Sequence, residues 1–311
     1  MKFDRLRHLR SQLPKVDATI LEIGPFFNPI YPKSAGFNTK TIDIFQREEL
    51  VSVAENELKL SQQFISRIEV VDFIWKGSLL ETVNQGIEFD VICSSHNFEH
   101  QPNPLLFLLE VEKLLAPGGI CTFAIPIASR CFDLFRNLST TKDFLLAYRE
   151  RKTKPEWLDV YEANNLKVNS DGIDLHKHHK FRVNELHLAK SYNSQNISHQ
   201  QLLFESPEDY IDTHMSVLNP SRFKLIMYEL SKLDVLSRLK VFDISERGHE
   251  FFVHLSNDRE PIADYELNWE QIVKLDLYYL RRELNHLCKS PNPLKSKYFF
   301  YDQGIGELSS R

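Results

Sequence analysis

The sequence predicts an α/β fold in which a mostly parallel sheet carries helices on both faces. Three observations predict it. Short apolar runs alternate with longer amphipathic stretches through residues 1–126, as strands alternate with helices in a parallel sheet. Two later apolar runs, joined by a short turn, indicate an antiparallel hairpin at the sheet edge. Residues 127–238 lie between these parts and hold helical patches and polar loops, which indicates a largely helical insertion.

Each parallel strand is expected at an apolar run, namely Thr19–Ile23, Lys40–Ile44, Ile68–Asp72, Asp90–Ser94 and Ile120–Pro126. Leu105–Leu115 is apolar at helical spacing, and Pro117-Gly118-Gly119 after it is a helix stop. The hairpin strands are expected at Leu239–Ile244 and Glu250–Leu255, with the turn around Gly248. Because the insertion follows the fifth strand, it is expected to cap the ligand crevice of the sheet.

The C-terminal part predicts one amphipathic helix over Ile262–Leu287. Its apolar seam covers only two heptads, so docking on its own domain is favoured over a coiled coil. The aromatic patch Tyr298-Phe299-Phe300-Tyr301 should be buried in its own chain or in a partner. The helix and tail are therefore candidate contacts for a second copy of the chain or for another protein.

Composition and charge narrow the class of protein. The 311 residues are 42% hydrophobic and 26% charged, which is typical of globular domains. A net charge of −5 argues against a nucleic-acid surface. No apolar run approaches a membrane span, and the charged first 13 residues do not resemble a secretory signal. The four cysteines lack CxxC pairing and are expected as reduced thiols in a cytoplasmic protein.

Polar residues end four of the predicted strands. Gly24 ends the first, Asp43 the second, Asp72 the third, and Ser94-Ser95-His96 the fourth. A carboxylate at the second strand end can accept hydrogen bonds from both hydroxyls of a ribose. Each residue also has a structural interpretation, because Asp43 could cap a helix and Asp72 could open a turn. Four polar strand ends in this order favour a nucleoside-binding crevice.

These segments resemble those of a class I S-adenosylmethionine-dependent methyltransferase, which has a Rossmann-like sheet. The resemblance covers residues 19–256 and extends to bacterial methyltransferase-domain proteins linked to surface-polysaccharide biosynthesis. It is carried by LEIGPFFNP at residues 21–29, Trp75-Lys76-Gly77, SHNFEH at residues 95–100, CFDLFRNLST at residues 131–140, His214 and Glu250-Phe251-Phe252. The first loop departs from the fuller GxGxG pattern, since only Gly24 remains. After Pro126 the family usually has a run of acidic, basic and aromatic residues. This chain has Ile127-Ala128-Ser129-Arg130 there instead.

The resemblance implies a division of the chain and a cofactor. Residues 1–126 would form the cofactor-binding half of the core, 127–238 the acceptor segment, 239–258 the final hairpin and 259–311 the C-terminal helix and tail. The cofactor would be S-adenosylmethionine, with S-adenosylhomocysteine as product. The residues expected to hold it are Glu22, Gly24, Pro25, Asn28, Asp43, Ile44, Asp72, Phe73, Ser95 and His96, with Asp72 and Phe73 at its adenine.

Methyl transfer to a hydroxyl needs a base within hydrogen-bond reach. The candidate catalytic residues are His96, His214 and Asp133. Candidate acceptor-binding residues are Arg130, Arg136 and His100. The arginines could bind a phosphate or carboxylate, or could form surface salt bridges. His96 could also simply cap the next helix, and His100 could pack at its start.

A metal site is not expected. Asp174 and the histidines of 176–179 are suitable ligand types, but Lys177 and Lys180 oppose a cation and the spacing is not a complete motif. The expected function is O-methylation of a saccharide or sugar-linked small molecule in surface-glycan biosynthesis.

Two other functions are alternatives to methyl transfer. A weakly active or inactive module could dock a partner of glycan assembly through the insertion, C-terminal helix and tail. A nicotinamide-dependent dehydrogenase would need a fuller glycine fingerprint than Gly24 supplies.

Overall fold

The computed structural model describes residues 4–15, 17–83, 86–170, 173–174, 186–188, 197–262 and 269–288. The histidines of 176–179 and the aromatic patch at 298–301 lie outside these residues, so the expectations about them stay predictions. No helix in the described ranges combines the length and the apolar character needed to cross a membrane.

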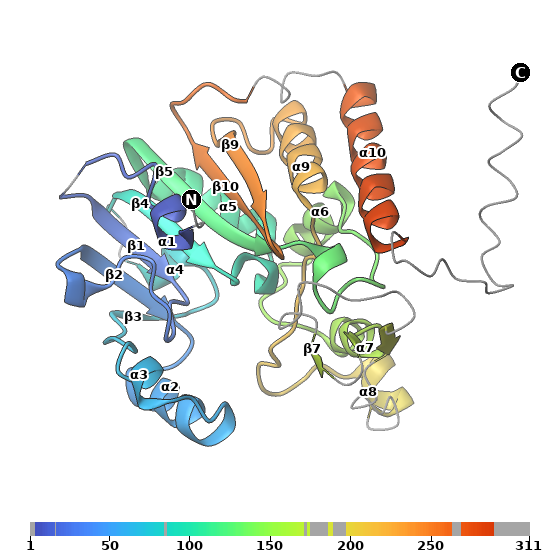
Figure 1. Cartoon of the computed structure of the whole chain (residues 1–311), viewed down its shortest axis with the longest axis horizontal. Helices are drawn as coiled ribbons and strands as arrows, with labels where there is room; N and C mark the ends of the chain where they lie inside the picture. The colour runs from blue at the N-terminus through green and yellow to red at the C-terminus, as the bar shows by residue number, and fades with distance from the viewer. Residues whose placement is uncertain are drawn as a thin grey trace, which may run out of the picture.

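A seven-stranded sheet forms the centre of the molecule, in the order β3-β2-β1-β4-β5-β10-β9 (Figure 1). Its first five strands are parallel, and β10 runs antiparallel to both of its neighbours. This confirms the predicted α/β class, the mostly parallel sheet and the C-terminal hairpin. The strands are β1 (Thr19–Ile23), β2 (Asn38–Asp43), β3 (Phe73–Ile74), β4 (Phe89–Ser95), β5 (Leu115–Pro126), β9 (Lys240–Arg247) and β10 (Glu250–Ser256).

The third strand is the one that the sequence misplaces. The prediction of a strand at Ile68–Asp72 is wrong, because β3 begins at Phe73. The apolar side chains that suggested the strand are buried for another reason. Ile68 and Val71 pack with Leu50 and Ala54 in a small core separate from the main one. Asp72 therefore precedes β3 instead of ending it.

Successive side chains along each strand point to opposite faces of the sheet and pack into two separate cores. Leu21, Ile23 and Phe123 belong to the larger core on one face. Ile20, Ala124 and Phe252 belong to the core on the other face. The period of two is what a sheet covered on both faces requires.

Ten α-helices are present in the described residues. They are α1 (Arg5–Leu9), α2 (Arg47–Ser52), α3 (Gln62–Ile65), α4 (Leu79–Thr82), α5 (Pro104–Leu114), α6 (Thr141–Arg149), α7 (Trp157–Asn165), α8 (His199–Phe204), α9 (Pro220–Lys232) and α10 (Trp269–Cys288). A π-helical turn, Val53–Glu57, continues α2. A 3₁₀ turn, Phe98–His100, follows β4.

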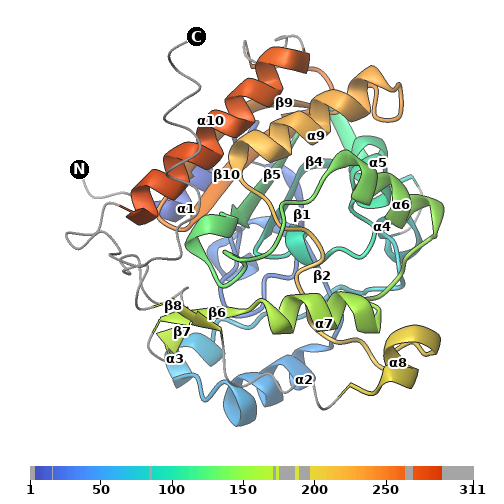
Figure 2. The same ribbon diagram turned by 90° about the vertical axis from the view of Figure 1, so that its right-hand side faces the viewer.

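Two of the longer helices begin in the same way. Asn103 caps α5 and Asn219 caps α9, each accepting a hydrogen bond from a backbone N–H three residues on, and a proline follows each cap. The buried face of α9 belongs to the larger core of the sheet. Figure 2 shows α9 and α10 side by side, and the two helices are in contact. Part of segment 127–238 therefore packs as a sheet-covering helix.

The rest of segment 127–238 is partly helical and partly extended. Besides α6, α7 and α8 it holds a small sheet in the order β7-β6-β8, with β6 at Val168–Ser170, β7 at Ile173–Asp174 and β8 at Leu186–Leu188. Figures 1 and 2 both place α7 and α8 at the same end of the molecule as α2 and α3.

Candidate functional site

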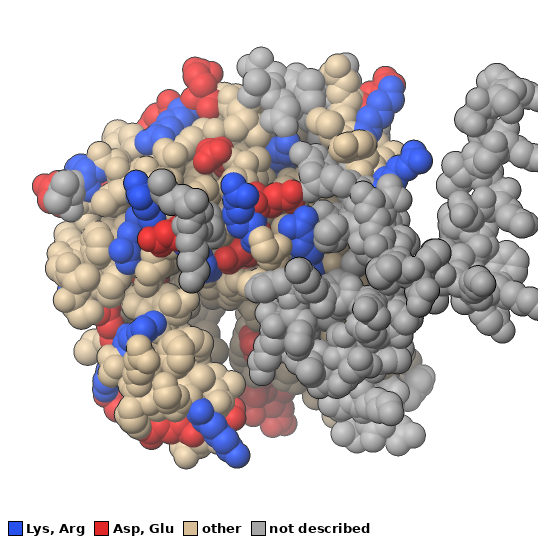
Figure 3. Space-filling model, in the orientation of Figure 1, with Lys and Arg blue, Asp and Glu red and all other residues tan. Residues whose placement is uncertain are grey.

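A cavity of about 730 Å³ lies beyond the carboxyl ends of β1, β2 and β4. The strand order reverses between β1 and β4, which is where open α/β sheets bind ligands. The other walls of the cavity come from α2 and the π-helical turn on one side and from residues of segment 127–238 on the other. Figure 3 shows the molecule hollowed beside the lobe of α2 and α3. The wall residues used below are Gly24, Asp43, Ile44, Trp75, Gly77, His96, Asn97, His100, Tyr210 and Asp212.

The end of β1 approaches the cavity through Gly24. Its φ of +61° lies in the left-handed region, where a side chain would be strained. A Cβ at this position would also meet Nδ2 of Asn97 at 2.8 Å. The backbone N–H of Gly24 donates to the carbonyl of Ile42 at 2.8 Å, which holds the turn against β2. The glycine therefore leaves room for Asn97 and for a ligand close to the backbone.

Asp43 ends β2 and faces the cavity. Burial raises the pKa of its carboxyl to about 6, although the backbone N–H groups of Ile44 and Phe45 donate to it and oppose the shift. The Ile44 bond measures 2.8 Å. A carboxylate with such a raised pKa is short of donors. It would gain from hydroxyl donors supplied by a ligand.

The two residues predicted to hold adenine lie outside the cavity wall. The carboxylate of Asp72 accepts from the ammonium groups of Lys33 and Lys40 and from the backbone N–H of Thr41. These donors lower the pKa of Asp72 even though burial works in the opposite direction. Phe73 packs against the larger core. Trp75 and Gly77, just after β3, line the cavity in their place.

Four other residues expected to hold the cofactor form hydrogen bonds within the protein instead; they are Glu22, Pro25, Asn28 and Ser95. Glu22 is buried and accepts from the backbone N–H groups of Ile30 (2.5 Å) and Tyr31 (3.0 Å), and burial raises its pKa to about 7. The carbonyl of Pro25 accepts from the N–H of Asn28 at 2.9 Å in a tight turn. Ser95 Oγ accepts from Arg5 at 2.5 Å. These residues shape the loop after β1 and the end of β4.

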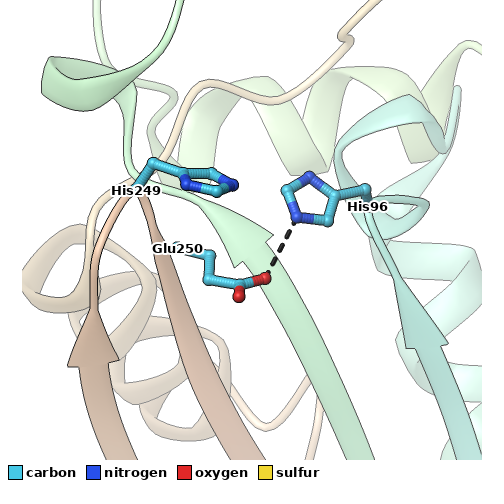
Figure 4. Close-up of side chains that lie close together, drawn as sticks. All are labelled: His96, His249 and Glu250. Atoms are coloured by element: carbon cyan, nitrogen blue, oxygen red, sulfur yellow. Dashed lines mark hydrogen bonds and ion pairs between the residues drawn. The ribbon is translucent and has the colours of Figure 1, made fainter. Parts of the chain in front are cut away.

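His96 follows β4 and lines the cavity with a strained backbone. Its φ is +52°, which is uncommon for a residue with a side chain and clusters at functional sites. Its Nε2 lies 3.1 Å from Oε2 of Glu250, the first residue of β10 (Figure 4). Its Nδ1 lies 3.7 Å from Oε1 of Glu99. The His249 ring lies close to it, with the two centroids 5.8 Å apart.

Glu250 is held as an ionised carboxylate. Arg5, in α1, donates to it through Nε at 2.7 Å and through Nη2 at 2.8 Å. Burial alone would raise the pKa of Glu250, but the hydrogen bonds from His96 and Arg5 lower it to about 2. Because an ionised carboxylate can only accept, Nε2 of the neutral His96 ring is the donor to Glu250, and Nδ1 is the basic nitrogen of that ring.

His214 and Asp133, two of the catalytic candidates, form a buried pair behind the cavity wall. Nδ1 of His214 lies 2.5 Å from Oδ2 of Asp133. Arg136 donates to Oδ1 of Asp133 and to the backbone carbonyl of His214, both at 2.9 Å. Burial works against ionisation, yet His214 and Arg136 lower the pKa of Asp133 to about 2. Arg136 is thus committed to this pair and to Glu162, away from any acceptor in the cavity.

The remaining acceptor candidates differ in position. Arg130 lies by the β9–β10 turn, where it donates to the carbonyl of Gly248 at 2.9 Å and contacts Glu246. His100 lines the cavity, with Nδ1 2.8 Å from Oδ1 of Asp212. Burial would lower the pKa of His100, but Asp212 and Glu99 outweigh it and raise the pKa.

Several residues of the site were not among the predicted ones. Glu99 sits inside the SHNFEH segment, and Trp75 follows the misplaced third strand, so both lay within segments already quoted. Glu250 begins a predicted strand, but its pairing with Arg5 joins residues 245 apart. Sequence alone carries no signal for that pairing.

The arrangement suits a nucleoside ligand with a reacting group near His96. Asp43 and Trp75 lie at one part of the cavity wall, and Gly24, Asn97 and His96 at the strand ends beside it. A histidine oriented by a carboxylate can take a proton from an acceptor hydroxyl.

The chain matches a known family model, and its fold is similar to that of solved structures. A family model described as a methyltransferase domain matches residues 2–229. The search of curated proteins finds no match. Among solved structures, the glycopeptide N-methyltransferase MtfA matches with a TM-score of 0.38 and 10% identity, over 81% of this chain and 88% of that chain. A protein from Pyrococcus horikoshii matches with a TM-score of 0.43 and 13% identity, over 81% and 88%. The CcbJ methyltransferase from Streptomyces caelestis matches with a TM-score of 0.41 and 7% identity, over 81% and 93%.

Proposed function

The chain belongs to the methyltransferase domain family, and on that premise we propose that it transfers a methyl group from S-adenosylmethionine to a hydroxyl of a saccharide or sugar-linked acceptor. The observation that carries the proposal is the position of Asp43 and His96 in one cavity, at the ends of β2 and β4. The first is suited to a ribose and the second to a reacting hydroxyl.

The cofactor would lie across the strand ends. Asp43 would accept from the ribose hydroxyls, and Trp75 with Ile44 would contact the adenine in place of Asp72 and Phe73. Gly24 would let the methionine part pass close to the backbone. Aromatic and apolar side chains bury the flat base, while one carboxylate fixes its orientation.

In the transfer step, the acceptor oxygen would attack the methyl carbon in line with the carbon–sulfur bond, which breaks and returns its electron pair to sulfur. The hydroxyl proton would pass to Nδ1 of His96, and Glu250 would stabilise the imidazolium through Nε2–H. The products are S-adenosylhomocysteine and a methyl ether. Positioning supplies much of the rate because the sulfonium already activates the methyl group.

The acceptor class rests on the sequence resemblance to surface-polysaccharide proteins. The wall from segment 127–238, with Tyr210, Asp212 and Lys154, offers hydrogen-bonding groups of the kind that hydroxyl-rich ligands need. This wall is the proposed acceptor side of the cavity.

The first test is calorimetric titration of S-adenosylhomocysteine into the wild type, Asp43→Ala and Asp72→Ala. We expect binding in the wild type, loss in Asp43→Ala and retention in Asp72→Ala, because only Asp43 faces the cavity. Absence of binding to the folded wild type would contradict the proposed cofactor. Equal losses in both variants would contradict the placement of the ribose.

The acceptor is tested by screening methyl transfer. Purified protein is supplied with labelled S-adenosylmethionine and with saccharides, nucleotide sugars and matched amines. Formation of methyl ethers on saccharides is expected. Transfer to amines alone would overturn the oxygen and saccharide assignment while leaving the cofactor in place.

A further inference from the structure

We propose that Glu99, His100 and His214 bind one divalent metal ion of the zinc class, joining the segment after β4 to segment 127–238. Glu99 and His100 lie in the 3₁₀ turn after β4, and His214 lies before α9. The proposal is independent of methyl transfer and departs from the sequence-based expectation of no metal site.

Glu99 is the first observation. Its side chain is 0% exposed, and neither carboxylate oxygen has a hydrogen-bond donor among the residues that the structure describes. A buried carboxylate without donors is costly, and proteins normally pair such a group or bind a cation with it. The molecule therefore holds an anionic group that calls for a positive partner at this point.

The Nε2 atoms of the two histidines face this carboxylate. Nε2 of His100 and Nε2 of His214 each lie 3.9 Å from Oε1 of Glu99. That separation is too long for a hydrogen bond. Two ligands about 2.0–2.1 Å from a shared tetrahedral zinc ion lie roughly 3.3 Å apart, so a small inward shift would complete the set. Ligand atoms of all three residues lie within 4.8 Å of one another.

Carboxylates orient both imidazoles from behind. Nδ1 of His214 lies 2.5 Å from Asp133, and Nδ1 of His100 lies 2.8 Å from Asp212. With Nδ1 of His214 hydrogen-bonded to Asp133, and Nδ1 of His100 in contact with Asp212, Nε2 is the nitrogen that carries the lone pair in each neutral ring. Carboxylate–histidine pairs of this kind typically stand behind zinc ligands, where they fix the tautomer and raise the basicity of the ligand.

A second cluster of one glutamate and two histidines serves as the internal contrast. His96, His249 and Glu250 also bring their ligand atoms together (Figure 4). There, however, Arg5 forms two hydrogen bonds to the carboxylate, and His96 contacts it directly at 3.1 Å. The guanidinium supplies the positive charge, so that cluster needs no cation.

Imidazole and carboxylate donors in a two-histidine, one-carboxylate set suit zinc and neighbouring divalent transition metals better than magnesium or calcium. His100 also lines the cavity, which leaves one side of the site facing a ligand. The ion would fasten segment 127–238 to the core at the wall of the cavity.

The test is metal analysis of the purified full-length protein, as isolated and after chelation and incubation with Zn²⁺. Zn²⁺ affinity is measured by competition with a chromophoric chelator. We expect one ion per chain in the wild type and in the matched control His249→Ala. Glu99→Gln and His214→Ala should lose it, with at least a hundredfold weaker affinity. Circular dichroism checks that each variant is folded, and Glu99→Gln is isosteric should His214→Ala fail to fold.

Cobalt substitution gives a readout that does not depend on activity. The wild type with Co²⁺ should show the visible absorption of a nitrogen- and oxygen-ligated ion, and Glu99→Gln should lose it. Three results would overturn the proposal: a wild type that binds no Zn²⁺, wild-type affinity in Glu99→Gln, or an ion lost only when the histidines of 176–179 are replaced by alanine.

Discussion

Two buried glutamates flank the ring of His96, Glu250 near Nε2 and Glu99 near Nδ1. They differ in what surrounds them. Glu250 receives two hydrogen bonds from Arg5 and a contact from His96, and these donors lower its pKa to about 2. Glu99 has no hydrogen-bond donor in the described part of the chain and faces histidine nitrogens at 3.7–3.9 Å.

The charge of Glu250 is offset by donors from the protein, whereas the charge of Glu99 calls for a positive partner that is added to the protein. Glu250 has its counter-charge in Arg5, so it can orient His96 and stabilise an imidazolium. In the described residues no arginine or lysine forms an ion pair with Glu99, so a bound cation would offset the cost of burying its charge. Similar residue types would thus serve the proposed base on one side and the proposed metal site on the other.

The largest expected effect is on the His96 side. His96→Ala should lower kcat about 10²- to 10⁴-fold, because a positioned base contributes that much to proton transfer. The affinity for S-adenosylhomocysteine should change far less. Kinetics with an acceptor found by screening, together with calorimetry, measure both.

The control for that change is His249→Ala, which removes a neighbouring imidazole and leaves the contact between His96 and Glu250 in place. A His96→Ala protein that keeps wild-type kcat would contradict the role of base and leave His96 as a residue of the cavity wall.

Arg5→Ala should lower the free energy of unfolding by about 3 kcal/mol, because it leaves the carboxylate of Glu250 buried without its main counter-charge. Urea unfolding measures it. Arg7→Ala, at an exposed position of the same helix, is the matched control and should cost little. The double variant Arg5→Ala, Glu250→Gln should recover part of the loss. If the two single changes simply add, the charge pairing does not explain the stability.

On the Glu99 side, Asp133→Asn should weaken Zn²⁺ affinity about 10- to 100-fold, the usual cost of changing a carboxylate behind a metal-ligating histidine. Competition with a chelator measures it. Asp143→Asn, at the exposed cap of α6, should leave the affinity unchanged. Unaltered affinity in Asp133→Asn would mean that His214 needs no orienting carboxylate, which weakens the contrast with Glu250.

The sheet was predictable because its signals are local. Thr19–Ile23 has the observed bounds of β1, and the hairpin around Gly248 needed only its two apolar runs and a turn. The prediction of the third strand was wrong because the apolar side chains of Ile68 and Val71 pack in a separate small core. Because β3 begins later than predicted, Trp75 and not Phe73 lines the cavity.

The site was predictable only in part, for a similar reason. Gly24, Asp43 and His96 end strands, so the order of the strands places them around one cavity. The pairing of Arg5 with Glu250 and the isolation of Glu99 depend on contacts between distant segments. No local pattern distinguishes a buried glutamate with an arginine from one without.

Asp43 gives the smallest expected effect and a third kind of carboxylate, one that a ligand would satisfy. Its pKa is raised to about 6 by burial, and the ribose hydroxyls would donate to the ionised form. The affinity for S-adenosylhomocysteine should therefore be constant above about pH 7, fall as the pH drops through 6, and be about tenfold weaker at pH 5. Calorimetry across this range measures it. In Asp43→Asn the weaker binding should lose this dependence, since the amide does not titrate. An unchanged profile in that variant would assign the titration to another group, such as His100, and would leave Asp43 as a hydrogen-bond acceptor whose charge does not matter.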